Sequence, residues 1–291
     1  MKKQTSAPAD ALILGAVAYD QKVVAIWDGF QQYFRARGLE CDYVLYSNYE
    51  RQVEAHFRGD IHVAWNSPLA WLQTERAARG LGRRAEALCM RDTDRDLASI
   101  ILVRSESAIH APSDLRQKSV AVGASDSPQA TLIPLSYLAD QGLAPEKDFR
   151  VTAFDVLTGK HGDHIGGERD ATRALIRGDA DAACILDANH LAFTREGTIP
   201  TGAVRMLAQT PVYDHCNFTI LDDAPATLVA RFRECLLSMS YGDAEVRPLL
   251  DLEGLKQWTP GRVTGYAQLA AAVDRFATID AFVTAVQARC S

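Results

Sequence analysis

The densest group of side chains that could do chemistry lies in residues 160–168, which hold two histidines, two acids and three glycines. Imidazole and carboxylate groups hydrogen-bond small ligands, and they are also ligand types for zinc. A metal site needs further partners at fixed spacing, so we expect no bound metal here. We expect His161, His164 and Glu168 to contact a ligand instead. The alternative is a solvated surface loop with Glu168 in the first turn of the following helix.

A second group, residues 213–216, places Cys216 directly after His215. This pair has the composition of a nucleophile and its base. Adjacent side chains on an extended chain point to opposite faces, so we do not expect the two to hydrogen-bond each other. We interpret Cys216 as a packed thiol, with a contact to a ligand or a soft metal as the alternative. The sequence has no glycine-rich phosphate loop, nucleophile elbow or cysteine-based zinc motif. We therefore predict no catalytic residue, no metal and no cofactor.

Other polar side chains follow the expected strands. In an open α/β fold, ligands bind at the carboxyl ends of the strands. Ser67 and Ser127 precede expected helices, so a plain helix cap is the alternative to a ligand contact. Asp187 could accept from a ligand ammonium or hydroxyl group, or cap a helix. We predict ligand contacts from Tyr19, Asn66, Ser67, Ser125, Ser127, Gln129, Asp187 and Tyr213.

Strand-like and helix-like segments alternate along the chain. Residues 11–18 form a continuous apolar run, typical of a parallel strand buried on both faces. Val23, Trp27, Phe30 and Phe34 then recur at helical spacing, and Gly38 stands where that helix should stop. We expect further strands at 41–46, 61–65, 97–103, 119–123, 149–154, 181–186, 204–208 and 218–221. We expect helices at 49–58, after Pro68, between 127 and 140 with an interruption at Pro134, at 168–177, and over nearly all of the chain beyond Pro225.

This alternation predicts an α/β fold with two similar lobes and mixed, mostly parallel sheets. The strand–helix pattern restarts after residue 103, and residues 57–64 resemble residues 176–183 as a helix end, a glycine stop and an apolar strand. We predict a first lobe from residues 11–98, a second lobe from 99–210, and a return to the first lobe over 211–291. The chain would cross between the lobes twice.

Composition excludes several classes of protein. Of 291 residues, 47% are hydrophobic and 23% charged, the profile of a soluble globular chain. The 31 basic and 37 acidic side chains leave a net charge of −6, which argues against a nucleic-acid partner. No apolar run approaches the roughly 20 residues that cross a bilayer, so no membrane insertion is expected. The six scattered cysteines are expected to be reduced and mostly buried.

The N-terminus bears on the compartment. Lys2 and Lys3 are followed by polar residues where a signal peptide would begin its apolar region. We therefore expect a cytoplasmic location as the sequence stands, or a periplasmic one if a leader has been removed.

Several segments resemble the phosphate/phosphite/phosphonate-binding family of ABC transporters, which has the type II periplasmic-binding-protein fold. Residues 59–70 (GDIHVAWNSPLA) are similar to the family's glycine–acid–strand–Pro–aliphatic–Ala segment. Residues 103–107, 113–116 and 119–123 match its entry into the second lobe, and residues 127–134 correspond to its ligand loop. Thr210-Pro211 and residues 266–276 also fit.

The ligand loop departs from the family's pattern. The family has Ser-Thr-Ser-Gly, whereas this chain keeps Ser127 and then has Pro128, Gln129 and Ala130. Pro128 removes an N–H donor, and two hydroxyls are missing. A helix start still favours negative charge. A carboxylate or a larger anionic metabolite is therefore as compatible with the loop as a phosphonate.

The resemblance implies a non-catalytic solute-binding protein whose lobes close on a small anionic or zwitterionic ligand, with an ABC permease as partner if the chain is exported. Ser127 and nearby N–H groups would bind the negative end, and Asp187 or Glu168 any cationic end. One alternative is a cytosolic enzyme on the same fold that acts on a small acid through histidine acid–base chemistry. A cytosolic ligand sensor is another.

Overall fold

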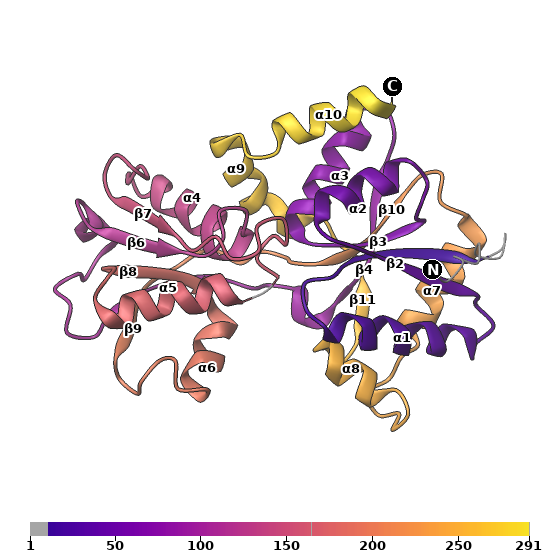
Figure 1. The fold of residues 1–291 in the computed structure, drawn as a ribbon, viewed down its shortest axis with the longest axis horizontal. Helices are drawn as coiled ribbons and strands as arrows, with labels where there is room; N and C mark the ends of the chain where they lie inside the picture. The colour runs from indigo at the N-terminus through magenta and orange to yellow at the C-terminus, as the bar shows by residue number, and fades with distance from the viewer. Residues whose placement is uncertain (1–10, 164, 291) are drawn as a thin grey trace, which may run out of the picture. The chain divides into compact units, whose positions relative to one another are not determined.

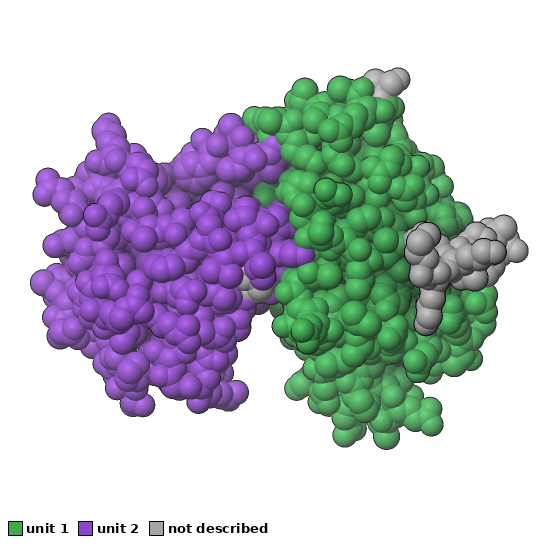
Figure 2. All heavy atoms as spheres, viewed as in Figure 1, with its two compact units in different colours: residues 1–94, 216–263, 280–291 green, residues 95–215, 264–279 purple. Residues whose placement is uncertain are grey.

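The computed structural model describes residues 11–163 and 165–290, and the chain divides into two compact units (Figure 2). Unit 1 comprises residues 1–94, 216–263 and 280–291, and unit 2 comprises residues 95–215 and 264–279. The sequence-based division assigned residues 264–279 to the first lobe, whereas they cluster with unit 2. The reason is the packing of α9 (Ala267–Phe276) on α4 (Ile133–Asp140), where Arg275 donates to the Ser136 carbonyl at 2.8 Å.

Unit 1 is built on a six-stranded mixed sheet in the order β11-β4-β10-β3-β1-β2 (Figure 1). β1 pairs in parallel with β2 and β3, which places Leu14 opposite both Tyr43 and Val63. β10 pairs antiparallel with β3 and β4. The strands are β1 (Leu12–Val17), β2 (Cys41–Tyr46), β3 (Val63–Asn66), β4 (Ala85–Arg91), β10 (Asn217–Leu221) and β11 (Trp258–Pro260).

Helices cover both faces of this sheet (Figure 1). On α1, Val23, Ile26, Trp27 and Phe30 make the apolar face that the spacing predicts, and Gly38 has a φ of 74° just beyond the helix. α1 and α8 lie on one face, and α2, α3 and α10 lie together on the other. The helices are α1 (Lys22–Arg35), α2 (Tyr49–Phe57), α3 (Pro68–Gly80), α7 (Ala226–Leu237), α8 (Arg247–Glu253) and α10 (Asp280–Cys290).

Unit 2 has a five-stranded mixed sheet in the order β7-β6-β8-β5-β9. Side chains alternate across β5, so that Ile101 and Val103 join the core beneath α4 while Ile100 and Leu102 join the core beneath α5. The strands are β5 (Ser99–Arg104), β6 (Ser119–Val122), β7 (Arg150–Ala153), β8 (Ala182–Leu186) and β9 (Val204–Gln209). Besides α4 and α9, the helices are α5 (Gly166–Arg177) and α6 (Asp187–Arg195), and a π-helical turn η3 (Pro128–Leu132) precedes α4.

The α/β class with two mixed sheets is confirmed, although parallel pairing is less dominant than predicted. Four of the nine strand pairs among the described residues are parallel and five are antiparallel. Two strands, β4 and β11, fall where no strand was predicted. Short apolar runs without strict alternation do not separate strand from helix. Pro134 lies in the first turn of α4, and the π-helical segment η3 runs directly into that helix with helical dihedrals at Leu132 and Ile133.

Candidate functional site

Ser127 directly precedes η3, as the sequence predicts. It is 1% exposed, and its Oγ accepts a hydrogen bond from the Ala130 N–H at 3.2 Å. Its carbonyl accepts from the N–H groups of Thr131 and Leu132. Ser127 is therefore a helix cap, the alternative that the sequence left open, and its own hydroxyl proton remains to be donated.

Gln129 lies two residues further along and is also buried. Its Nε2 donates to the Gly162 carbonyl at 2.8 Å and to Glu168 Oε1 at 3.3 Å, while its backbone carbonyl accepts from Ser99 Oγ at 2.5 Å. Gly162 approaches this turn very closely: its φ is 76°, and a Cβ there would lie 2.3 Å from Ser127 Oγ. The chain thus needs glycine at this position for both space and conformation.

Glu168, in the first turn of α5, is 2% exposed and joins three segments. Its Oε2 accepts from the Leu186 N–H at 2.9 Å and from Asn189 Nδ2 at 2.8 Å, and its Oε1 accepts from Gln129. Burial raises the pKa of Glu168, and these three donors oppose the rise. Through these hydrogen bonds the carboxylate connects the end of β8 and the start of α6 to η3. The sequence could not indicate Asn189, because its contact with Glu168 is long-range.

Three other predicted residues of unit 2 are Tyr213, Asp187 and Ser125. Tyr213 is buried and its hydroxyl lies 2.8 Å from Ser99 Oγ, which places it next to Gln129 through Ser99. Burial raises the pKa of Tyr213. Asp187 is the first residue of α6, half-buried, and its Oδ1 accepts from the Ala188 N–H. Ser125 is exposed, and its N–H donates to Asp155 Oδ1 at 2.7 Å.

Of the two histidines in residues 160–168, the structure describes His161. His161 is fully buried with a φ of 51°, so this part of the segment is not the solvated loop considered as an alternative. His164 lies outside the described residues. A ligand contact from either remains a prediction.

In unit 1, the predicted residues end β3 and begin α3. Asn66 is fully buried: its Nδ2 donates to Thr219 Oγ1 at 2.9 Å, and its Oδ1 accepts from Gln52 Nε2 at 2.8 Å. Ser67 is fully buried and caps α3, with its Oγ accepting from the Ala70 N–H at 3.1 Å. Tyr19 follows β1, half-buried against the core of unit 1. The structure thus gives Asn66 and Ser67 supporting hydrogen bonds at the carboxyl end of β3.

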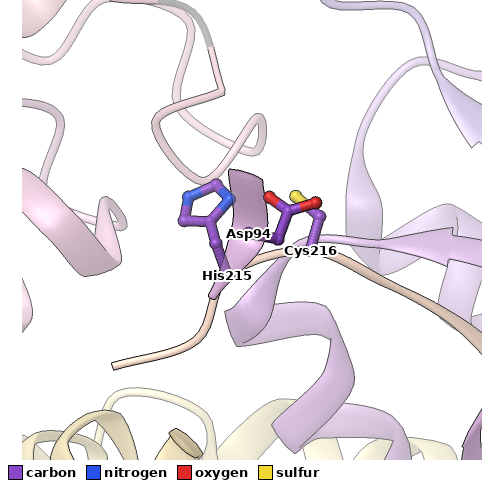
Figure 3. A group of neighbouring side chains, drawn as sticks. All are labelled: Asp94, His215 and Cys216. Atoms are coloured by element: carbon purple, nitrogen blue, oxygen red, sulfur yellow. The ribbon is translucent and has the colours of Figure 1, made fainter. Parts of the chain in front are cut away.

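Asp94, His215 and Cys216 are buried and each offers one ligand atom, all within 4.8 Å of one another (Figure 3). Residues 214–216 lie outside regular strand, so the expected divergence of neighbouring side chains does not hold there. Both oxygens of Asp94 accept from Arg91, at 2.6 and 2.8 Å. The guanidinium balances the carboxylate, so an ion pair accounts for this residue without a metal.

The chain is thus an α/β protein of two units, with hydroxyl, amide and carboxylate groups gathered at the start of η3 in unit 2. A family model described as ABC transporter, phosphonate, periplasmic substrate-binding protein matches residues 16–266. The chain therefore belongs to the phosphonate-binding family of ABC transporter substrate-binding proteins, which confirms the resemblance noted in the sequence. Proteins of this family bind small anionic ligands and serve ABC transporters.

Solved structures share the fold of this chain. PhnD1 from Prochlorococcus marinus, in complex with methylphosphonate, has a TM-score of 0.69 at 16% identity, covering 93% of this chain and 99% of that chain. XAC2383 from Xanthomonas citri, bound to ATP, has a TM-score of 0.67 at 17% identity, covering 96% and 98%. The periplasmic aliphatic sulphonate binding protein SsuA from Escherichia coli has a TM-score of 0.60 at 19% identity, covering 97% and 92%. No curated protein sequence matches the chain. No described helix is long and apolar enough to cross a membrane.

Proposed function

We propose that this chain binds a small anionic or zwitterionic ligand, a phosphonate, another oxyanion or a carboxylate, without converting it. The start of η3 carries the proposal. Ser127 stands there with a hydroxyl that caps the helix as an acceptor and can still donate to a ligand. A helix start also favours negative charge.

Removing the Ser127 hydroxyl removes its hydrogen bond to the ligand, and the loss can be measured as a change in binding free energy. We expect Ser127→Ala to weaken binding of the ligand by about 1.5–3 kcal/mol, the range for a hydrogen bond to a charged group. The variant also loses a helix cap, which costs about 1 kcal/mol of stability, so its folding must be measured alongside. Ser105→Ala is the matched control, because Ser105 is an exposed serine of the same unit.

The experiment combines a thermal-shift screen of small phosphonates, sulfonates and carboxylates with calorimetry on the ligands that stabilise the chain. A ligand that binds only the folded state contributes about 2.7 kcal/mol at a hundredfold excess over its dissociation constant. Affinity that falls in Ser127→Ala and not in Ser105→Ala supports the proposal. Equal affinity in both variants would move the site away from η3.

The partner and the compartment follow from the same proposal. Delivery to an ABC permease requires an exported chain, so the periplasm is the compartment in which this function operates. A chain retained in the cytoplasm would act as a ligand sensor instead. Fractionation of the host cell, with detection of the chain in each compartment, distinguishes the two.

A further inference from the structure

A cavity of about 300 Å³ lies within unit 1, between the turn that follows α2 and the loop that joins β10 to α7. His56, Gly59 and His62 line it from the first segment, and residues 223–225 line it from the second. We call it the His56 cavity. A Cβ added at Gly59 would meet nothing within 4 Å, so the chain leaves this part of the wall unpacked.

His56 brings buried polar atoms without partners to this cavity. The side chain is 3% exposed, and neither Nδ1 nor Nε2 has a hydrogen-bond partner among the residues that the structure describes. Burial lowers the pKa of His56 to about 4, so the ring is neutral at neutral pH and carries one donor and one acceptor. Leaving such atoms buried and unpaired is destabilising, so they call for a partner that the cavity can admit.

His62 adds a donor whose orientation is fixed by β1. Its Nδ1 accepts from the Ile13 N–H at 3.0 Å, and its backbone N–H donates to the Ile13 carbonyl at 2.8 Å. Burial lowers the pKa of His62, so the neutral ring carries its proton on Nε2. A ring in this state has no lone pair left for a metal ion. It calls for a ligand atom that accepts a hydrogen bond.

The charge on the cavity wall is already balanced. Among the described residues that line the cavity, Asp223 is the charged one, and its Oδ1 lies 2.5 Å from Arg83 Nη2. An anion would therefore meet a carboxylate without a free cation, and an ammonium group would have to compete with Arg83. The other oxygen of Asp223 can accept from a hydroxyl group. The wall thus fits a neutral ligand.

We propose that the His56 cavity binds a small neutral polyhydroxy compound, a polyol or a monosaccharide, through His56, His62 and Asp223. A hydroxyl group both donates and accepts, so neighbouring hydroxyls accept from His62 Nε2 and donate to His56 and Asp223. The volume is at the lower end of the range of about 300–1,000 Å³ for small-molecule sites. This second site lies in unit 1, whereas η3 belongs to unit 2, so it goes beyond the proposed function and does not depend on it.

Matched ligand pairs test the chemistry of this site on the whole, tag-free chain with ¹⁵N-labelled histidine at about pH 8, where both rings are neutral. Nuclear magnetic resonance of the ring nitrogens compares glycerol with glycerate, ribitol with ribonate, and sorbitol with gluconate. Within each pair, a terminal hydroxymethyl group is replaced by a carboxylate. We expect at least one polyol to shift both His56 and His62 in a saturable manner, and to bind about tenfold more tightly than its partner.

Two results would overturn the inference and leave the proposed function standing. One is the absence of a saturable shift at His56 and His62 with any of the three polyols. The other is equal or tighter binding of the carboxylates. Melting temperatures are not the readout, because polyols also stabilise folded proteins by exclusion from their surface.

His56→Leu tests the residue assignment, with binding followed at His62. We expect the affinity for the polyol to fall about tenfold or more, and His56→Gln, which keeps a donor and an acceptor, to recover most of it. His110→Gln is the matched control, since His110 is an exposed histidine of unit 2. Unchanged affinity in His56→Leu would overturn the role of His56.

Asp223→Ala is a second test that does not disturb the core, because the Asp223 side chain is 65% exposed. We expect the affinity for the polyol to fall about threefold or more, the loss of one hydrogen bond. Asp222→Ala is the matched control, since it removes the same charge from the same arginine and Asp222 is not part of the cavity wall. Equal affinity in the two variants would overturn the role of Asp223.

Discussion

Acidification will destabilise unit 1 through one buried histidine. His56 lies in the last turn of α2, is 3% exposed, and neither of its ring nitrogens has a hydrogen-bond partner among the described residues. Burial lowers the pKa of His56 from 6.5 to about 4. The nearby backbone of His62 acts in the opposite direction but is the smaller effect. The imidazole is therefore neutral in the folded chain under conditions in which it binds a proton in the unfolded chain.

The pH dependence of the stability follows from the difference in the pKa of His56 between the folded and unfolded states. Below a pH of 6.5 the unfolded state takes up a proton that the folded state does not, so stability is lost as the pH falls from 6.5 toward 4. The loss should be about 2 kcal/mol at about pH 5, and about 3 kcal/mol once the folded state also protonates. Above a pH of 6.5 the contribution of His56 is flat.

The chain provides a specific probe for this measurement. All four tryptophans, Trp27, Trp65, Trp71 and Trp258, belong to unit 1 and are buried there. Denaturant unfolding followed by tryptophan fluorescence therefore reports on the unit that contains His56. The comparison is made between wild type and His56→Leu from about pH 8 to about pH 5.

We expect the His56→Leu variant to lose about 2 kcal/mol less stability over this range than the wild type. Leucine fills a buried site without a polar group, so the variant should be at least as stable as the wild type at about pH 8. Parallel pH profiles in the two proteins would refute the reasoning, because the other titratable groups are shared. A large loss of stability at about pH 8 would show that the ring has a partner after all.

Three further predictions concern other parts of the chain. Gly162→Ala should lower the melting temperature of unit 2, because alanine is strained at a φ of 76° and its Cβ would meet Ser127 Oγ; a thermal melt followed by circular dichroism checks this. Glu168→Leu should cost about 2 kcal/mol or more in denaturant unfolding, since the Leu186 N–H and Asn189 Nδ2 lose their acceptor, and a loss under about 1 kcal/mol would contradict that network. Ellman's reagent should react rapidly with one thiol of the native chain, Cys290, the exposed cysteine among six, and Cys290→Ser should abolish the rapid phase.

The local patterns that could be read from the sequence are those in which a residue's role depends on its near neighbours. The helical spacing from Val23 to Phe34 predicts α1, and Ser67 before Pro68 predicts the cap of α3. β4 was missed because its run from Ala85 to Arg91 lacks the alternation that marks a half-buried strand.

The candidate site was harder to predict because its residues contact partners that lie far away in the sequence. Ser127 could be placed at a helix start, but the close approach of Gly162 depends on a segment more than thirty residues away, a separation of 33 for the bond from Gln129. The sequence predicts a ligand contact for Asn66 but not the hydrogen bonds that its side chain makes with Gln52 and Thr219. A single sequence carries no signal for such pairs.

The central claim is that the chain binds its ligand and releases it unchanged. Native mass spectrometry of the freshly purified, tag-free chain, followed over time with an excess of whichever ligand stabilises it, tests this most directly. We expect one ligand per chain, recovered chemically intact after prolonged incubation. Accumulation of a converted product in excess of the protein, at a rate that changes with pH across the histidine range, would contradict it.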